Sequence, residues 1–85
     1  MVNVTLNKYD SLDAVLPALE LAMHTGDVCR IRNIDFLGRA HLAALCLLAM
    51  SENLMDSDTG QVFHPHPGFR LFGVDEQGTS RSLLM

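Results

Sequence analysis

The 85-residue sequence has few basic residues, no long apolar run and no leader-like start. Six lysines and arginines stand against ten aspartates and glutamates, which gives a formal net charge of −4. Nucleic-acid binding normally needs a basic surface, so we expect no nucleic-acid partner. No apolar stretch approaches the roughly 20 residues of a membrane span, so we expect no membrane partner. The start, MVNVTLNKYD, lacks the basic and apolar blocks of a signal peptide, which predicts a cytoplasmic protein.

Cysteine and histidine are too sparse to indicate a catalytic or metal centre. Cys29 and Cys46 lie in apolar segments, and we expect them to pack rather than form a disulfide. Cys46 and His41 have no accompanying oxyanion-hole signal that would suggest a nucleophile and its base. His64 and His66 could place two imidazoles on one ion, but a metal site needs a third or fourth ligand. We therefore expect no catalytic residue, no metal and no cofactor, and we expect the histidine-proline segment to be irregular because neither proline can donate to a β-ladder.

Three segments have the composition of β-strands. Residues 2–6 alternate apolar and polar side chains, which is typical of a half-buried strand. Residues 27–32 and 69–74 are the other two predicted strands. The turn-rich residues 53–60 precede an apolar pair in residues 61–63, and this order predicts a short hairpin before the last strand.

Two segments have the apolar spacing of helices. The first lies between residues 12 and 25, where Pro17 either belongs to the first turn of a helix that begins near Leu16 or kinks a longer one. Gly26 is expected to end this helix in a left-handed conformation. The second helix, residues 37–52, has almost no polar face. Such a helix is either buried on several sides or in contact with another chain.

The order strand, helix, strand, helix, strand gives two parallel crossovers, which are right-handed in nearly all proteins. We expect an α/β protein, a small two-layer fold with about three parallel strands in chain order and both helices on one face of the sheet. Residues 1–78 are expected to form this single domain. Residues 79–85 are expected to form a flexible tail unless their apolar end docks.

Helices on only one face would leave the other face of the sheet uncovered, and we call this other face the open face. The side chains expected to point there are those of Asn3, Thr5, Arg30, Arg32, Arg70 and Phe72. Three of the six basic residues belong to this group. Since a parallel sheet is normally covered on both faces, the open face is either a solvated surface or a docking face. The candidate interaction residues are Arg30, Arg32, Arg70 and Phe72.

Two blocks of the sequence resemble one family of ATPases. LPALELAMHTGDVCRIRNIDFLGRAHLAALCLLAM is similar to the second helix, the Walker B strand and the following helix of AAA+ ATPases of the MoxR, cobalt-chelatase and midasin group. TGQVFHPHPGFRLFGVDEQG is similar to that group's hairpin, its His-Pro-x-Phe-Arg-Leu-Phe run and its sensor-1 strand. The resemblance implies a degenerate fragment of the ATPase fold in which these strands are neighbours.

The chain departs from this family at the positions that carry the chemistry. The family's catalytic Asp-Glu pair falls on Arg32 and Asn33, and only Ile34 and Asp35 are kept. The aspartate of that pair holds magnesium and the glutamate orients the attacking water, which an arginine and an amide cannot do. The sensor asparagine falls near residues 75–76, and no Gly-x-x-x-x-Gly-Lys-Ser/Thr phosphate loop is present. The resemblance therefore implies a fold without enzymatic activity.

We expect a non-catalytic interaction protein that either forms a homo-oligomer or docks onto another protein. An alternative hypothesis follows from the resemblance: a small regulator or inhibitor of an AAA+ or other multi-subunit complex that mimics one piece of a subunit. Products of phages and mobile elements often have this size.

Overall fold

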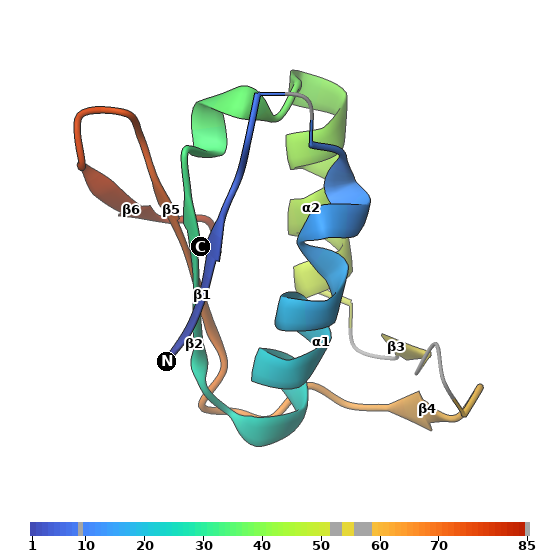
Figure 1. Ribbon diagram of the computed structural model, residues 1–85. Helices are drawn as coiled ribbons and strands as arrows, with labels where there is room; N and C mark the ends of the chain where they lie inside the picture. Colours follow the sequence, from blue (N-terminus) through green and yellow to red (C-terminus); the bar gives the residue numbers. More distant parts are fainter. Residues whose placement is uncertain (9, 52–53, 56–58, 85) are drawn as a thin grey trace.

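The protein is a two-layer α/β structure, in which a four-stranded sheet carries two helices on one face (Figure 1). The computed structural model describes residues 1–8, 10–51, 54–55 and 59–84. The strand order in the sheet is β1–β2–β5–β6. These strands are β1 (Val2–Thr5), β2 (Val28–Arg32), β5 (Arg70–Val74) and β6 (Ser80–Ser82). The predicted fold class is confirmed, with one strand more than expected.

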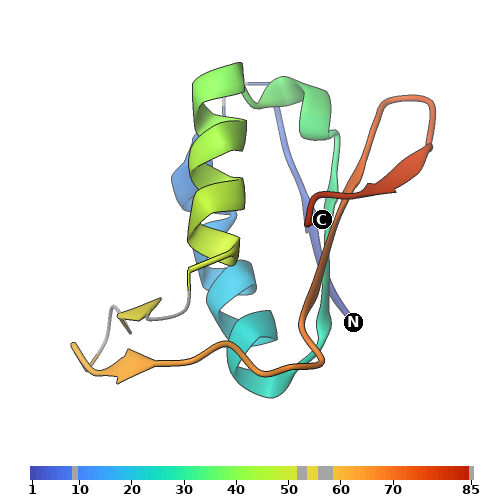
Figure 2. The ribbon, with the colours of Figure 1, turned by 180° about the vertical axis from the view of Figure 1, so that it is seen from behind.

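The three predicted strands are parallel neighbours in chain order. β1 pairs with β2, and β2 pairs with β5, both in parallel register. Helix α1 (Leu16–Thr25) follows β1, and helix α2 (Arg39–Ala49) follows β2. Both helices lie on the same side of the sheet, which is visible from the front and from behind (Figures 1 and 2). In the part of the chain that the structure describes, no helix covers the opposite face of the sheet.

Short elements connect these parts. A 3-10 turn, η1 (Leu12–Ala14), precedes α1, and a second, η2 (Ile34–Phe36), links β2 to α2. Strands β3 (Leu54–Met55) and β4 (Val62–Phe63) form a separate antiparallel pair ahead of β5. This pair is the hairpin predicted from the turn-rich segment, while Asp56 and Asp58 of that segment lie outside the described residues.

The ends of α1 follow from two residues with unusual backbones. Pro17 lies in the first turn, where its missing N–H leaves no helical hydrogen bond unmade, so it starts the helix rather than kinking it. Gly26 ends the helix with a left-handed backbone at φ 73°. Its N–H and that of Asp27 both donate to the carbonyl of Ala22, which satisfies the end of the helix.

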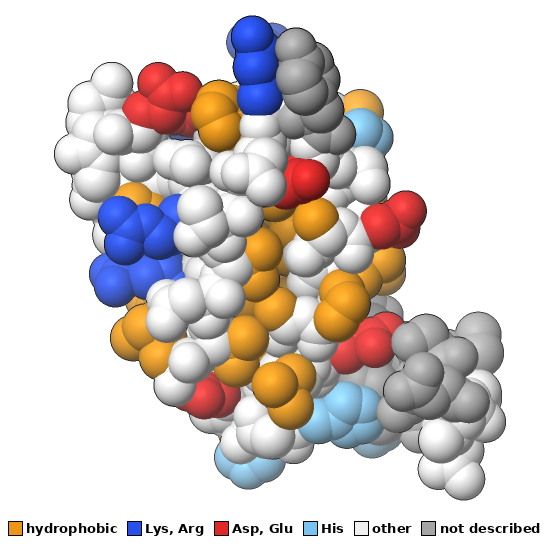
Figure 3. All heavy atoms as spheres, viewed as in Figure 1, with side chains coloured by type: hydrophobic (Ala, Val, Ile, Leu, Met, Phe, Trp, Pro, Cys, Tyr) orange, Lys and Arg blue, Asp and Glu red, His pale blue; other side chains and the backbone are white. Residues whose placement is uncertain are grey.

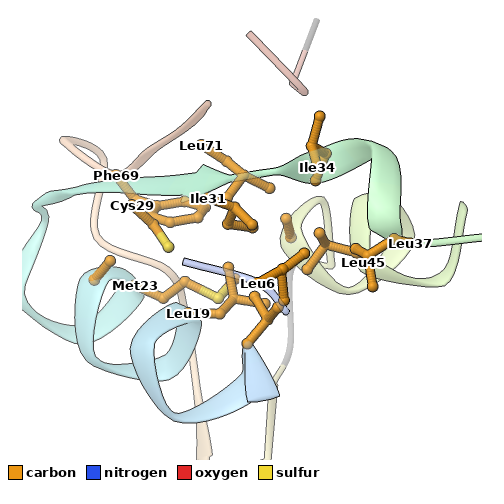
Figure 4. Close-up of a cluster of buried hydrophobic side chains, with 13 residues drawn as sticks. Leu6, Leu19, Met23, Cys29, Ile31, Ile34, Leu37, Leu45, Phe69 and Leu71 are labelled. Carbon is orange, nitrogen blue, oxygen red and sulfur yellow. The ribbon is translucent and has the colours of Figure 1, made fainter. Parts of the chain in front are cut away.

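The core lies between the sheet and the helices (Figure 4). β2 and β5 contribute Cys29, Ile31 and Leu71, which are fully buried. Met23 of α1 and Leu45 of α2 meet them from the other layer. Each buried large aliphatic side chain contributes about 1.5–3 kcal/mol to folding, so the apolar face of the sheet is the main source of stability.

The histidine-proline segment is attached to the end of α1. The N–H of His66 donates to the carbonyl of Met23 at 2.8 Å, and the N–H of Gly68 donates to Nδ1 of His66 at 3.0 Å. The imidazole of His66 lies so close over Gly26 that a Cβ there would overlap the ring. The irregular segment that the sequence predicts therefore clamps the start of β5 against the turn between α1 and β2.

The structure differs from the expectation that the domain ends at residue 78. Residues Ser80–Ser82 form β6, which pairs antiparallel with β5. The N–H of Leu83 donates to the carbonyl of Leu71 at 2.9 Å, and the side chain of Leu83 packs beside Gly73. The apolar end thus docks on the core. The strand itself could not be recognised in the sequence because all three of its residues are exposed.

We expect Gly26→Ala to lower the free energy of unfolding, as measured by urea denaturation. The left-handed backbone should cost about 1 kcal/mol, and the overlap with His66 should add about 1 kcal/mol or more. Gly78→Ala is the matched control, because Gly78 also has a positive φ, 84°, but has open space around its Cβ position. Gly78→Ala should therefore show only the cost of the left-handed backbone. In a double-mutant cycle, His66→Ala should remove the second cost, and purely additive effects would contradict the clamp.

Candidate functional site

The open face contains the residues expected there, and the sheet register brings most of them together. Arg30, on the inner strand β2, lies between Asn3 of β1 and Phe72 of β5. Arg32 lies one position further along the same face, beside Thr5. Residues two positions apart on a strand point to the same side, about 6.6–6.8 Å apart. The two arginines therefore form a short row in the middle of the face.

The structure extends the open face beyond these residues. The open-face positions of β2 and β5 also hold Val28 and Val74, and β6 adds Ser80 and Ser82 beside β5. Val74 is only 6% exposed although it lies outside the main core cluster. The alternation of side chains could have identified the two valines, whereas the serines depend on a strand that the sequence does not reveal.

Arg70 differs from the other two arginines of the group. Its guanidinium turns back along the chain and donates to the carbonyls of Pro67 and Phe69, at 3.0 and 2.8 Å. Within the described part of the chain, no hydrogen bond or ion pair engages the side chain of Arg30 or of Arg32. The predicted group of three arginines is therefore a pair of uncommitted cations and one that stabilises its own loop.

Acidic side chains lie at the two ends of the sheet rather than on it. Asp27, just before β2, pairs with the terminal amino group of Met1 at 2.9 Å and accepts a hydrogen bond from the N–H of Val28. The bond to the amino group and the bond from Val28 both hold the pKa of Asp27 below its usual value. Figure 3 shows one group of Lys and Arg side chains on the sheet side of the molecule and a second group at its top, with acidic side chains above and below the first group.

The loop from β5 to β6 places further carboxylates at the carboxyl end of the strands. Asp75 accepts hydrogen bonds from the N–H groups of Gln77 and Thr79. Asp35 accepts a longer one, 3.4 Å, from the N–H of Glu76. These carboxylates shape the loop. Among the described residues, no group of three or more His, Cys, Asp or Glu side chains is placed to hold a metal ion.

The two positions that the resemblance aligns with the catalytic pair have other roles here. Arg32 is exposed on the open face. Asn33 has a left-handed backbone at φ 60°, and its side-chain amide donates to the carbonyl of Leu6 at 3.2 Å. An asparagine tolerates this conformation better than most residues. Asn33 thus joins the carboxyl ends of β1 and β2 at the turn into η2.

Helix α2 is buried on one side only. Leu45 and Ala49 are in the core, whereas Leu47 and Met50 are 67% and 56% exposed. We call the exposed residues Leu47, Leu48 and Met50 the α2 patch. Of the two possibilities left by the all-apolar sequence, burial on several sides does not apply to these positions. Neither helix in the described residues has the length and apolar character needed to cross a bilayer.

The two cysteines differ in their surroundings. Cys29 is fully buried between the layers, and this burial raises the pKa of its thiol to about 11. Cys46, on α2, is only half-buried. Both are free thiols, as the sequence predicts.

Comparisons with models of protein families, with curated proteins and with solved structures found no match. The resemblance to the AAA+ group accordingly depends on the residues quoted for it.

We expect thiol reagents at pH 8 to modify Cys46 in the folded protein and Cys29 only after unfolding, because Cys29 is fully buried.

The burial of the Cys29 thiol also makes the stability of the protein depend on pH. The unfolded thiol ionises near its usual pKa of 9.0 and the folded one near 11, so the unfolded state loses its proton first and stability should fall between pH 9 and pH 11. Thermal unfolding of Cys29→Ala should lack this part of the alkaline loss. An equal alkaline loss in both proteins would contradict this account.

Proposed function

We propose that this protein is a non-catalytic interaction protein that docks onto another protein through its open face. The observation that carries the proposal is the sheet itself, which has helices on one face and, in the middle of the other, two arginines without a partner among the described residues. A parallel sheet is usually covered on both faces because its strands are apolar throughout. Here β1 and β2 alternate apolar and polar side chains, so part of the second face can stay exposed and present a surface of defined chemistry.

The composition of the open face supports docking rather than simple solvation. Phe72 and Val28 are half-buried, so they still offer apolar surface next to the charges. Arginine and aromatic residues are enriched in protein–protein interfaces because they combine large contact area with directed hydrogen bonds. Asn3 and Thr5 provide an exposed polar rim along β1.

The α2 patch supports self-association as a second use of the surface. Leu47 and Met50 are large and exposed, and Ala40 and Ala43 continue the same side of the helix toward its start. None of these side chains carries a charge, so two copies can meet there about a two-fold axis. The contact would be small compared with the roughly 800 Å² per partner of a stable interface, so the expected association is weak.

A regulator that mimics a subunit of an AAA+ machine is the second candidate. It is favoured by the parallel order β1–β2–β5 with a hairpin before β5, which is the arrangement that the resemblance implies. Arg32 and Asn33 offer no carboxylate for magnesium, which suits an inhibitor better than an ATPase. Copurification with a MoxR-type ATPase that loses activity on binding would support this candidate, and unchanged activity in the mixture would contradict it.

We expect light scattering over a concentration series, up to about 1 mM, to show weak dimer formation. Leu47→Glu should raise the concentration needed for dimers by about tenfold or more, because it places an unpaired charge in the contact. Arg30→Glu is the control on the opposite face and should leave the series unchanged. Leu45→Glu is unsuitable because Leu45 is fully buried. A monomer at every concentration would remove self-association from the proposal.

Docking through the open face has a separate test. A photo-crosslinking amino acid at Thr5 should give a discrete crosslinked partner in cells, because Thr5 is exposed at the edge of that face. The same amino acid at Ala40, which is exposed on the outer side of α2, is the matched control and should not give this band. Identical products from the two positions would contradict docking through the open face.

A further inference from the structure

The strands of the sheet are entirely free of acidic residues although the protein as a whole is acidic. β1, β2, β5 and β6 contain Arg30, Arg32, Arg70 and Arg81 and no aspartate or glutamate. The whole chain has ten acidic residues against six basic ones. Since Arg30 and Arg32 have no partner among the described residues, the middle of the open face presents two positive charges to whatever covers it. The covering group should therefore be anionic at this point.

A second copy of this chain does not fit the open face. A two-fold pairing of two open faces would set the β2 arginines of one copy against those of the other, and like charges in a contact are repulsive. A helix of a second copy does not provide the complement either. The only carboxylate in α1 is Glu20, and α2 has none. Neither of these two arrangements supplies a pair of carboxylates, so a different molecule is the better occupant.

A nucleic acid is also a poor occupant. A phosphate backbone needs an extended basic surface. On this protein the two arginines are bounded by Asp27 at the amino end of the sheet and by Asp35, Asp75 and Glu76 at its carboxyl end. These carboxylates would repel a polyanion that extends past the row, whereas a protein segment can place its few charges in the middle only.

The missing layer of the fold indicates the shape of the occupant. A parallel sheet is normally covered on its second face by helices. Side chains at positions i and i+4 of a helix are about 6.0 Å apart along its axis, and Arg30 and Arg32 are about 6.6–6.8 Å apart along β2. Two carboxylates one helical turn apart therefore match the two guanidinium groups, and arginine binds carboxylate with two parallel hydrogen bonds. Apolar residues between the carboxylates would meet Phe72 on β5.

We propose that the open face binds an amphipathic helix of another protein. Carboxylates at positions i and i+4 of that helix pair with Arg30 and Arg32, and its apolar side chains pack on Phe72. The inference depends on the docking function proposed above and specifies the chemistry of the partner. The bound helix would complete a three-layer α/β/α arrangement across two chains. Arg70 has no place in the contact because its guanidinium holds the loop before β5.

The test uses a synthetic peptide of about 18 residues, long enough to be partly helical alone, with Glu at i and i+4 and Leu at i+3 and i+7 of one face. The matched peptide has Gln in place of Glu. Titration of the ¹⁵N-labelled protein should shift the amides of β2 and β5, with little effect on α2. Raising the salt concentration from 50 to 500 mM should weaken binding several-fold, since the contact is between charges.

Two charge-matched variants locate the contact. Arg30→Gln with Arg32→Gln should weaken binding of the Glu peptide by about tenfold or more, because both charge-assisted pairs are lost. Arg39→Gln with Arg81→Gln removes the same charge at exposed positions away from the row and should leave affinity within about twofold.

Equal binding of the Gln peptide, or unchanged binding to the Arg30/Arg32 variant, would overturn the proposal, and so would the absence of binding. The peptide tests only the chemistry proposed for the partner. After such a result, the crosslinking experiment at Thr5 still decides whether the open face docks onto a protein at all.

Discussion

The structure depends on strand β2, which buries apolar side chains on the helix side of the sheet and carries two arginines on the other side. In most parallel sheets both sides are buried, and the strands are uniformly apolar. Here Cys29 and Ile31 face the helices while Arg30 and Arg32 alternate with them on β2. A one-residue shift in the register of β2 would exchange these two sets of side chains. The register that buries the core is therefore also the register that exposes the arginines. The open face is the direct consequence of how the core is built.

The clamp at the end of α1 has a similar double role. His66 and Gly68 attach the segment before β5 to the turn around Gly26, and the N–H of Arg70 donates to the carbonyl of Asp27 at 3.3 Å. These contacts set the start of β5 beside the start of β2. They also determine that Phe72 lies next to Arg30. A segment that could be mistaken for a metal-binding motif thus positions the apolar part of the candidate surface.

The distribution of charge gives this surface its chemistry. Asp27, Asp35 and Asp75 lie at the ends of the sheet, where each accepts a hydrogen bond from a backbone N–H, and every charged residue within β1, β2, β5 and β6 is an arginine. The α2 patch on the opposite layer is uncharged. We accordingly propose different occupants for these two surfaces, a second copy for the α2 patch and an acidic partner for the open face. Both can be occupied at once because they lie on opposite layers.

Much of this could be predicted from the sequence because it depends on local patterns. The alternation in β1 and β2, the helical spacing around Leu19 and the positions of Pro17 and Gly26 determined the elements, their order and the two-layer fold. The side of the sheet on which Arg30 and Arg32 lie followed from the same alternation.

Only the tertiary structure decided the features that depend on contacts between distant residues. Sequence spacing grouped Arg70 with the other arginines, but its guanidinium is held by carbonyls of the loop before it. β6 has no apolar residue of its own, and it forms because β5 offers a free edge and Leu83 finds space beside Gly73. Leu45 and Leu47 lie on opposite sides of an almost wholly apolar helix, about 200° apart around its axis, and only the placement of the sheet decides that Leu45 is buried and Leu47 exposed. Local patterns determine what a segment can form, whereas burial is decided by what the rest of the chain places against it.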